Sequence, residues 1–227
     1  MKSDGLYLVN KPLGWTSFQA VKKIRRILQK KLGMKLKVGH AGTLDPLATG
    51  LLIICSGKMT KKINEFQTLK KEYTGTFFLG ATTPSFDLET PIDESFPVNH
   101  INTKQLYEAA IKLTGNLKQI PPDFSAKWVL GERAYHKARR GEKMELKPKE
   151  VIVYSFEILT SELPLIDFKI VCSSGTYIRA LARDFGELLG SGAHLTKLCR
   201  TKIGEYSLLN SIKIDYDSSF DWNKAMN

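Results

Sequence analysis

The sequence predicts an α/β (α+β) protein with one mixed, mainly antiparallel sheet flanked by helices. The chain of 227 residues is long enough to bury a large core. About eight strand-like segments and three or four helix-like segments occur along it, and most strands follow one another closely, which favours antiparallel pairing. We therefore expect residues 1–227 to form a single domain. A segment of different composition at about 118–150 is called the insertion below.

The first half of the chain alternates strand-like and helix-like segments. Thr16 and Gln19 form a capping-box pattern, so a helix begins there, and Gly33 ends it. Three prolines indicate a long surface loop over 81–102, and Thr103 is expected to cap the helix that follows. The predicted order is strand 6–9, helix 16–32, strand 51–55, helix 60–69, strand 72–79 and helix 103–113.

The second half begins with the insertion, in which residues 134–140 are expected to form a short helix. Two β-rich segments flank Pro164 and are predicted to pair with each other. The next segment, 176–189, has apolar residues at helical spacing, and we expect its inner side to include Leu188. The predicted elements are strands 151–159 and 165–172, helix 176–189, and two short strands at 194–200 and 203–208.

The charge of the chain is strongly basic. Lys and Arg outnumber Asp and Glu by 34 to 23, which gives a formal net charge of +11. The excess is local, because residues 16–37 contain eight basic residues and no acidic one. Such a distribution indicates a polyanionic partner such as a nucleic acid. The alternative is a surface charge that serves solubility alone.

The insertion at 118–150 differs in composition from its surroundings. It holds nine basic and five acidic residues, together with Phe124 and Trp128. Aromatic side chains among arginines suit unstacked bases, and each stack is worth roughly 1–3 kcal/mol. A solvated loop with a short helix is the alternative interpretation.

The cysteines and the apolar segments limit the class of protein. Cys55, Cys172 and Cys199 are an odd number, far apart, and no CxxC pair is present. Neither a disulfide framework nor a zinc site is expected, and a reducing cytoplasm fits. No segment has the pattern of a signal peptide or the roughly 20 apolar residues that cross a bilayer.

Residues 39–50 contain the densest set of chemically useful side chains. Asp45, His40 and two threonine hydroxyls stand among three glycines, and an apolar strand follows. Glycines let the backbone approach a ligand closely, and Pro46 fixes the backbone beside Asp45. The pattern indicates a positioned reagent. The alternative is a loop in which Asp45 caps its own backbone.

Four motifs connect this loop to a known family. Residues 11–17 read KPLGWTS, 40–52 HAGTLDPLATGLL, 71–73 KEY and 175–184 GTYIRALARD. In this order and spacing they resemble the TruB family of tRNA pseudouridine synthases, over nearly the whole chain from about residue 5 to residue 207. The resemblance implies a pseudouridine-synthase-like fold and an isomerase that converts uridine 55 in the T loop of tRNA. It also implies that no cofactor is needed and that no metal is bound.

The same resemblance implies three catalytic residues. Asp45 matches the family's aspartate, which either attacks the ribose or acts as a base that generates a glycal. Arg179 matches the arginine that pairs with this aspartate, and Tyr73 matches the tyrosine that stacks on the target base. That tyrosine is also discussed as the acceptor of the proton on carbon 5. In the plainer interpretation, Arg179 is a helix-surface residue paired with Asp184, and Tyr73 is a half-buried sheet residue.

Four further residues match substrate-binding positions of the family. His40 matches the histidine that helps to hold the flipped base, and Tyr177 and Leu198 match positions that line the uridine pocket. Lys11 matches a lysine of the first motif, which we expect to support the active loop or to meet a phosphate. Hydrogen bonding for His40 and core packing for Leu198 are the alternatives.

Many family members carry a further C-terminal RNA-binding domain of the PUA type. Few residues follow Ser207, and they are acidic, so we expect no such domain here. Affinity for tRNA would then rest on the catalytic domain and on the insertion at 118–150. We expect a monomer in the cytoplasm that binds the T stem-loop of tRNA and no membrane.

Two other classes of protein are compatible with parts of the sequence. A phosphotransferase with an aspartyl nucleophile needs a second acid two residues after Asp45, where this chain has Leu47. A Walker loop is also missing from the sequence. A non-catalytic RNA-binding protein or chaperone would explain the charge and the aromatic residues. It would not explain the combination of Asp45, Tyr73 and Arg179.

Overall fold

A computed structural model describes residues 3–125, 127–129, 131–142 and 144–214 of the chain. The chain divides into two compact units: unit 1 comprises residues 1–74 and 198–227, and unit 2 comprises residues 75–197. The acidic tail at 215–227 lies outside the described residues. The predictions of a single domain and of an RNA-binding insertion stay predictions. In the described part of the chain, no helix is long and apolar enough to cross a membrane.

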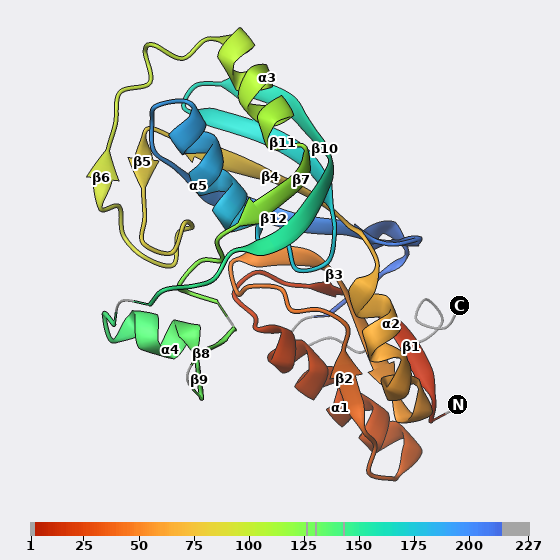
Figure 1. The fold of residues 1–227 in the computed structure, drawn as a ribbon. Coiled ribbons are helices and arrows are strands. Elements are labelled where there is room, and N and C mark those ends of the chain that lie inside the picture. The colour runs from red at the N-terminus through yellow and green to blue at the C-terminus, as the bar shows by residue number, and fades with distance from the viewer. Residues whose placement is uncertain (1–2, 126, 130, 143, 215–227) are drawn as a thin grey trace. The chain divides into compact units, whose positions relative to one another are not determined.

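Unit 1 contains strands of a mixed sheet, in the order β14-β1-β3-β12, of which β1, β3 and β12 are labelled in Figure 1. Strand β3 pairs with β1 and β2 in antiparallel orientation and with β12 in parallel orientation, and β1 pairs with β14 in parallel orientation. The elements here are β1 (Gly5–Lys11), α1 (Ser17–Leu32), β2 (Val38–His40), β3 (Ala48–Ser56), the 3₁₀ helix η1 (Gly57–Lys62), α2 (Ile63–Thr68), β13 (Tyr206–Ser207), the 3₁₀ helix η2 (Leu208–Asn210) and β14 (Ile212–Lys213).

Strands β4 (Lys71–Leu79) and β12 (Ala193–Ile203) contribute residues to both units. Within unit 2 the order is β4-β11-β10-β7, and β10 pairs with both β11 and β7 in antiparallel orientation. The other elements are β5 (Ala81–Thr82), β6 (Glu94–Ser95), α3 (Thr103–Lys112), β7 (Gly115–Gln119), β8 (Trp128–Val129), β9 (Glu132–Arg133), α4 (Ala134–Arg139), β10 (Lys149–Glu162), β11 (Leu165–Cys172) and α5 (Ile178–Leu188). The mixed, mainly antiparallel sheet expected from the sequence is confirmed.

Strand β3 is apolar on both faces because helices cover both. Leu52 and Ile54 pack with the apolar stripe of α1 and with β1. Leu51, Ile53 and Cys55 face the other way and pack with Phe66 of α2 and with Ile203. Alternate residues of a strand point to opposite faces, so a run of five apolar residues is what a doubly covered strand requires.

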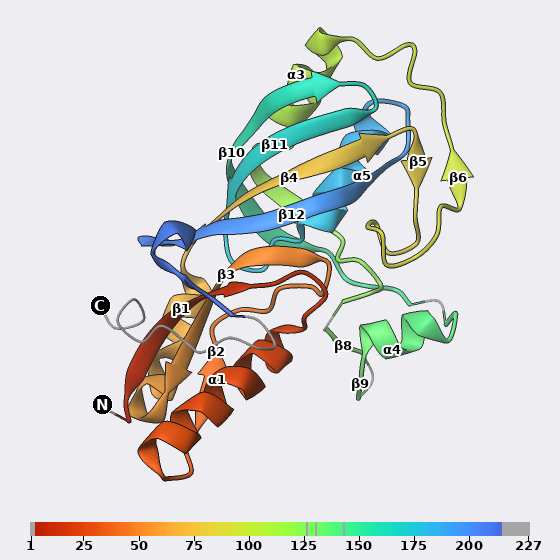
Figure 2. The same cartoon turned by 180° about the vertical axis from the view of Figure 1, so that it is seen from behind.

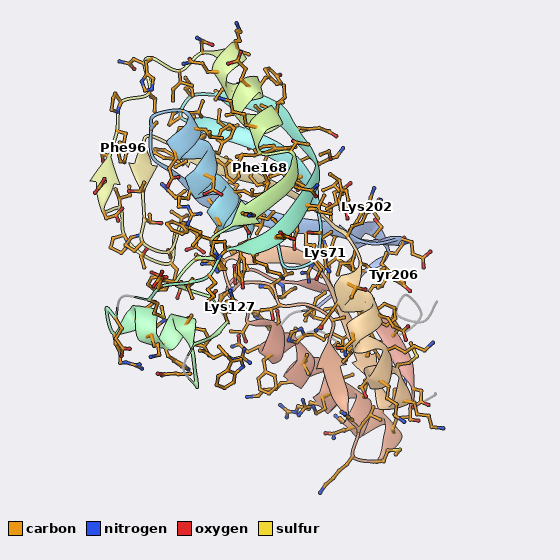
Figure 3. All side chains as sticks on the ribbon, in the orientation of Figure 1. Lys71, Phe96, Lys127, Phe168, Lys202 and Tyr206 are labelled. Carbon is orange, nitrogen blue, oxygen red and sulfur yellow. The ribbon has the colours of Figure 1, made fainter. Side chains whose placement is uncertain are left out.

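Helix α5 lies on one face of the strands of unit 2, as Figures 1 and 2 show from opposite sides. An aromatic cluster joins this helix to the sheet. The ring of Phe77 on β4 is 4.2 Å from that of Phe168 on β11 and 5.7 Å from that of Phe185 on α5. Phe168 is fully buried (Figure 3). Such pairs add about 0.5–1.5 kcal/mol each beyond the area they bury.

Several predicted elements are confirmed with small changes of boundary. Thr16 and Gln19 form the expected capping box of α1, and Gly33 ends that helix in the left-handed conformation. The strands predicted at 6–9, 51–55, 72–79, 151–159 and 165–172 are present as β1, β3, β4, β10 and β11, and the helices at 134–140 and 176–189 as α4 and α5.

Other predictions were wrong in detail. Asn102, not Thr103, caps α3, because its side chain accepts from the main-chain N–H of Gln105. Helix 60–69 begins as the 3₁₀ helix η1. The two strands predicted at 194–200 and 203–208 are present as β12 and β13, but β12 extends to Ile203 and β13 comprises only Tyr206–Ser207. Leu188 is 43% exposed and does not face the core.

The segment 81–102 is less loop-like than predicted. It contains the paired strands β5 and β6, and it buries Thr83, Ser85 and Asp87. The prolines correctly indicated breaks in regular structure, but the polar residues between them fold inward. Ser85 and Asp87 of this segment contact Arg179, as described below.

Candidate active site

Residues 41–47, named the Asp45 loop below, connect β2 to β3 and carry a half-buried Asp45. None of these residues belongs to a strand, so the loop is anchored by single hydrogen bonds. Ala41 N donates to Ile53 O at 2.9 Å, Gly14 N donates to Pro46 O at 2.8 Å, and Ala48 N donates to Asp45 O at 3.1 Å. The loop is thereby tied to β3 and to the loop after β1, and it closes into a turn at Asp45.

Ser17 fixes the residue that precedes Asp45. Its hydroxyl accepts from Leu44 N at 2.8 Å and is within 3.1 Å of Leu44 O, to which it donates. Both main-chain polar groups of Leu44 are therefore satisfied by one buried side chain at the start of α1. The capping box that starts α1 thus also places the hydroxyl that holds the Asp45 loop.

Lys11 holds the other side of the loop. It is fully buried at the end of β1, and its ammonium donates to Trp15 O at 2.6 Å, Pro12 O at 3.0 Å and Pro46 O at 3.4 Å. Burial lowers the pKa of Lys11 from 10.5 to about 8, while the Asp45 carboxylate acts in the opposite direction. These contacts tie Lys11 to the Asp45 loop, and both roles expected for Lys11 stay predictions.

Arg200 on β12 is a site residue that sequence reasoning missed. It is 1% exposed, and its guanidinium donates to Leu51 O at 2.8 Å, Gly42 O at 3.1 Å and Thr43 O at 3.3 Å. The sequence feature that could have indicated Arg200 was an arginine at the end of the strand-like segment 194–200.

His40 ends β2, just before the Asp45 loop. Its Nδ1 is buried and has no hydrogen-bond partner among the residues that the structure describes. Burial lowers the pKa of His40, and Arg200 lowers it further. These shifts favour the neutral imidazole, although a main-chain hydrogen bond with Gly42 acts in the opposite direction. Neutral imidazole has one nitrogen that donates and one that accepts.

Leu198 and Tyr73 lie on strands that neighbour each other. Leu198 pairs with Ala48 in the parallel β12–β3 ladder, and Thr49 Oγ1 donates to Leu198 O at 3.3 Å. The structure therefore brings Leu198 next to the strand that follows Asp45. Tyr73 lies on β4 and is 8% exposed. Phe77 and Leu79 of the same strand are buried as well.

Arg179 and Tyr177 belong to unit 2. Arg179 is buried, which rules out the helix-surface alternative, and Asp184 pairs with Arg183 at 2.6 Å. The Arg179 guanidinium donates to Ser85 O at 3.1 Å and Phe124 O at 2.9 Å. Its Nε lies 3.6 Å from a carboxylate oxygen of Asp87. Because Asp45 belongs to unit 1, the pairing of Arg179 with Asp45 stays a prediction.

Asp87 is a second residue that sequence reasoning missed. Its carboxylate also accepts from Glu89 N at 2.9 Å, and its carbonyl accepts from the hydroxyls of Thr83 and Ser85. The sequence feature that could have indicated Asp87 was the cluster of polar residues in a segment predicted to be a surface loop. Tyr177 is fixed separately, because its main chain makes reciprocal hydrogen bonds with the Gln119 amide at 2.8 and 3.0 Å.

Exposed aromatic residues stand beside cations in both basic regions of the chain. On α1, Phe18 is 53% exposed and the Lys22 ammonium lies 4.9 Å from its ring centre. Between β8 and β9, Trp128 is 62% exposed and the Arg133 guanidinium lies 4.4 Å from its ring centre. In the described residues, no group of three or more His, Cys, Asp or Glu could hold a metal ion.

Comparison with known proteins gives one family. The N-terminal domain of the TruB family of pseudouridylate synthases matches residues 25–178. A protein named tRNA pseudouridine synthase B from Flavobacterium johnsoniae is 56% identical over 209 residues, which cover 91% of each chain. The protein of the same name from Phocaeicola vulgatus is 56% identical over 215 residues, covering 94% of this chain and 92% of its own.

Solved structures agree on the fold. A chain in the "Crystal Structure of a Cbf5-Nop10-Gar1 Complex" superposes with a TM-score of 0.69 at 25% identity, covering 93% of this chain and 53% of that chain. The present chain therefore spans about half the length of that solved chain. Since the family match covers more than half of the sequence and the relatives match nearly end to end, the chain belongs to the TruB family of pseudouridylate synthases, which are isomerases.

Proposed function

We propose that this protein converts uridine 55 in the T loop of tRNA into pseudouridine, with Asp45 as the nucleophile. The observation that carries the proposal is the Asp45 loop, in which side chains hold the main chain on both sides of one half-buried carboxylate. Relatives named tRNA pseudouridine synthase B, 56% identical over 91% of both chains, support the choice of substrate. They are bacterial, and we expect the reaction to take place in the cytoplasm on a monomeric enzyme.

The reaction is an isomerisation that needs neither an oxidant nor water as a reactant. The bond between C1′ of the ribose and N1 of uracil breaks, the uracil turns, and C1′ bonds to C5 instead. The proton on C5 leaves and N1 gains one, so atoms and charge balance. A single carboxylate can start this sequence, either by adding to the ribose or by forming a glycal as a base.

The other site residues take supporting roles in this proposal. Tyr73 stacks on the target base and accepts the C5 proton, and Arg179 pairs with the Asp45 carboxylate and stabilises its charge. His40, Tyr177 and Leu198 line the pocket of the flipped uridine. Base flipping costs a few kcal/mol, which contacts elsewhere must supply.

The basic regions supply those contacts in the proposal. Helix α1 and the insertion at 118–150 offer exposed aromatic rings beside cations, which is the combination that stacks on unpaired bases and meets phosphates. The excess of 34 basic over 23 acidic residues serves the same purpose.

The test is release of tritium from unmodified tRNA that carries 5-tritiated uridine. We expect release by the wild type and at least about a 10⁴-fold slower rate for Asp45→Asn, because the amide cannot act as nucleophile or base. Asparagine can still cap a turn, so this variant distinguishes a role of Asp45 in the reaction from a role in stabilising the turn. Normal tritium release by Asp45→Asn would refute the proposal. Replacing uridine 55 by cytidine in the tRNA should abolish release and tests the position.

A further inference from the structure

Arg200 is a buried cation whose hydrogen-bond partners in the described structure are all main-chain carbonyls. Each of its three nitrogens donates once: Nε to Leu51, Nη1 to Thr43 and Nη2 to Gly42. In the described part of the chain, the guanidinium forms no salt bridge to a carboxylate. A buried charge of this kind is costly for stability. Stability therefore does not explain why Arg200 is buried beside the Asp45 loop.

The position of Arg200 is set by an unusually close contact between strands. Arg200 pairs with Gly50 in the short parallel ladder between β12 and β3. A Cβ atom on Gly50 would lie 2.4 Å from the Arg200 carbonyl oxygen. Glycine therefore lets β12 approach the start of β3, and the arginine side chain reaches from there to the Asp45 loop.

The three acceptors of Arg200 belong to different parts of the site. Leu51 is inside β3, whereas Gly42 and Thr43 lie in the Asp45 loop, three and two residues before Asp45. The planar guanidinium bridges a rigid strand and a loop that has no strand pairing of its own. A lysine ammonium is a point charge without this fixed fork and cannot reproduce the same three contacts.

We propose that Arg200 is a positioning residue, which acts through the main chain of the Asp45 loop to hold the Asp45 carboxylate at the reacting ribose. This inference rests on the proposed function. Ser17 fixes Leu44, and Lys11 with Gly14 fixes Pro46, so Arg200 completes a set of anchors on both sides of Asp45. A misplacement of about 1 Å at a reacting group can cost about 10²-fold in rate.

The test compares Arg200→Lys with the wild type under single turnover, well below the melting temperature of the variant. We expect the rate of tritium release to fall by about 10²-fold, while the Kd for tRNA changes less than about threefold because the Arg200 side chain is buried and not exposed at the protein surface. The matched control is Lys202→Ala on the same strand. The Lys202 side chain, which is labelled in Figure 3, is 52% exposed and pairs with Glu72 at 3.5 Å. Its rate should stay within about twofold of the wild type.

The outcomes separate this inference from the proposed function. If the wild type releases no tritium, the proposed function fails. If the wild type is active and folded Arg200→Lys reacts at the same rate, only the positioning role is overturned. An equal loss of rate and of tRNA affinity also overturns it, since a general structural defect would give that result.

Arg200→Gln covers the case in which the lysine variant does not fold. Glutamine keeps an amide donor for one or two of the carbonyls and brings no buried charge. As for Arg200→Lys, we expect a slow single-turnover rate together with a near-normal affinity for tRNA. If neither variant shows a cooperative thermal transition by circular dichroism, Arg200 is a folding requirement and the positioning proposal is overturned.

Discussion

Asp45 stands in a loop whose main chain is held by side chains from three distant parts of the sequence. Ser17, Lys11 and Arg200 each contact main-chain atoms within three residues of it. This arrangement fixes a carboxylate without covering it, because the anchoring contacts are made to the backbone and leave the side chain half-buried. Preorganisation of this kind lowers the cost of placing a reagent against its substrate.

Lys11 gives the stability of the protein a specific pH dependence. Its pKa is about 8 in the folded protein and 10.5 when the side chain is in water. Between these pH values the unfolded chain binds more protons than the folded one, so the free energy of unfolding rises with pH. Below about pH 8 the folded protein carries the full cost of the buried charge.

We expect Lys11→Met to lose this contribution. Urea denaturation from pH 7 to pH 10 measures the free energy of unfolding of both proteins. The wild type should gain stability relative to the variant as the pH rises through the window from about 8 to 10.5. Parallel curves for the two proteins would show that burial does not perturb this lysine.

At the scale of elements, the contact of β12 with β3 depends on Gly50. This residue has a φ of 105°, and any side chain there would collide with the backbone of Arg200. The parallel ladder between these strands joins residues that lie far apart in the sequence. Gly50 therefore determines how closely β12 approaches the Asp45 loop.

We expect Gly50→Ala to destabilise the protein by at least about 3 kcal/mol, since backbone strain and a steric clash add together. Gly33→Ala is the matched control, because Gly33 has a φ of 65° but no atom lies within 4 Å of the place that a Cβ would take there. This control should cost only the strain, about 1–2 kcal/mol. Chemical denaturation measures both values. Similar losses of stability for the two variants would show that the close contact between β12 and β3 adds no cost beyond the backbone strain.

Local patterns in the sequence predicted elements well when their cause is local. The capping box at Thr16 and Gln19 gave the start of α1, and the apolar run after Gly50 gave β3. The short strands β2 and β14 were missed, since each exists through pairing with a strand elsewhere. The buried contacts of Arg200 and of Asp87 with Arg179 were missed for the same reason: the partners lie far away in the sequence.

For the site residues found through the motifs, the sequence predicted the positions but not the contacts. The motifs gave Asp45, Lys11 and Arg179, but the sequence could not tell which contacts each would make. Lys11 meets three carbonyls, and Arg179 is buried beside Asp87 rather than on a helix surface. Burial of a charged residue depends on what packs around it, and periodicity alone does not report that.

At the scale of the whole molecule, the charge is concentrated where the proposed RNA surfaces lie. The formal net charge is +11, and the segment 16–37 carries eight basic residues without an acid. Helix α1 buries its apolar stripe against β1 and β3, so exposed basic residues such as Lys22 and Arg26 remain on the other side. A polyanion that binds here releases counterions, which makes affinity depend on salt.

We expect the Kd for tRNA to rise steeply with salt concentration. With a slope of about 0.9 per phosphate contact, four contacts predict roughly a 10²-fold loss of affinity between 50 and 200 mM salt. The double variant Lys22→Ala, Arg26→Ala should reduce the slope by about two. Lys104→Ala on α3 is the control, because that side chain is 84% exposed and pairs with Glu108. Equilibrium filter binding over this salt range measures the slopes. A wild-type slope near zero, or an equal reduction by the control, would place the RNA surface elsewhere on the protein.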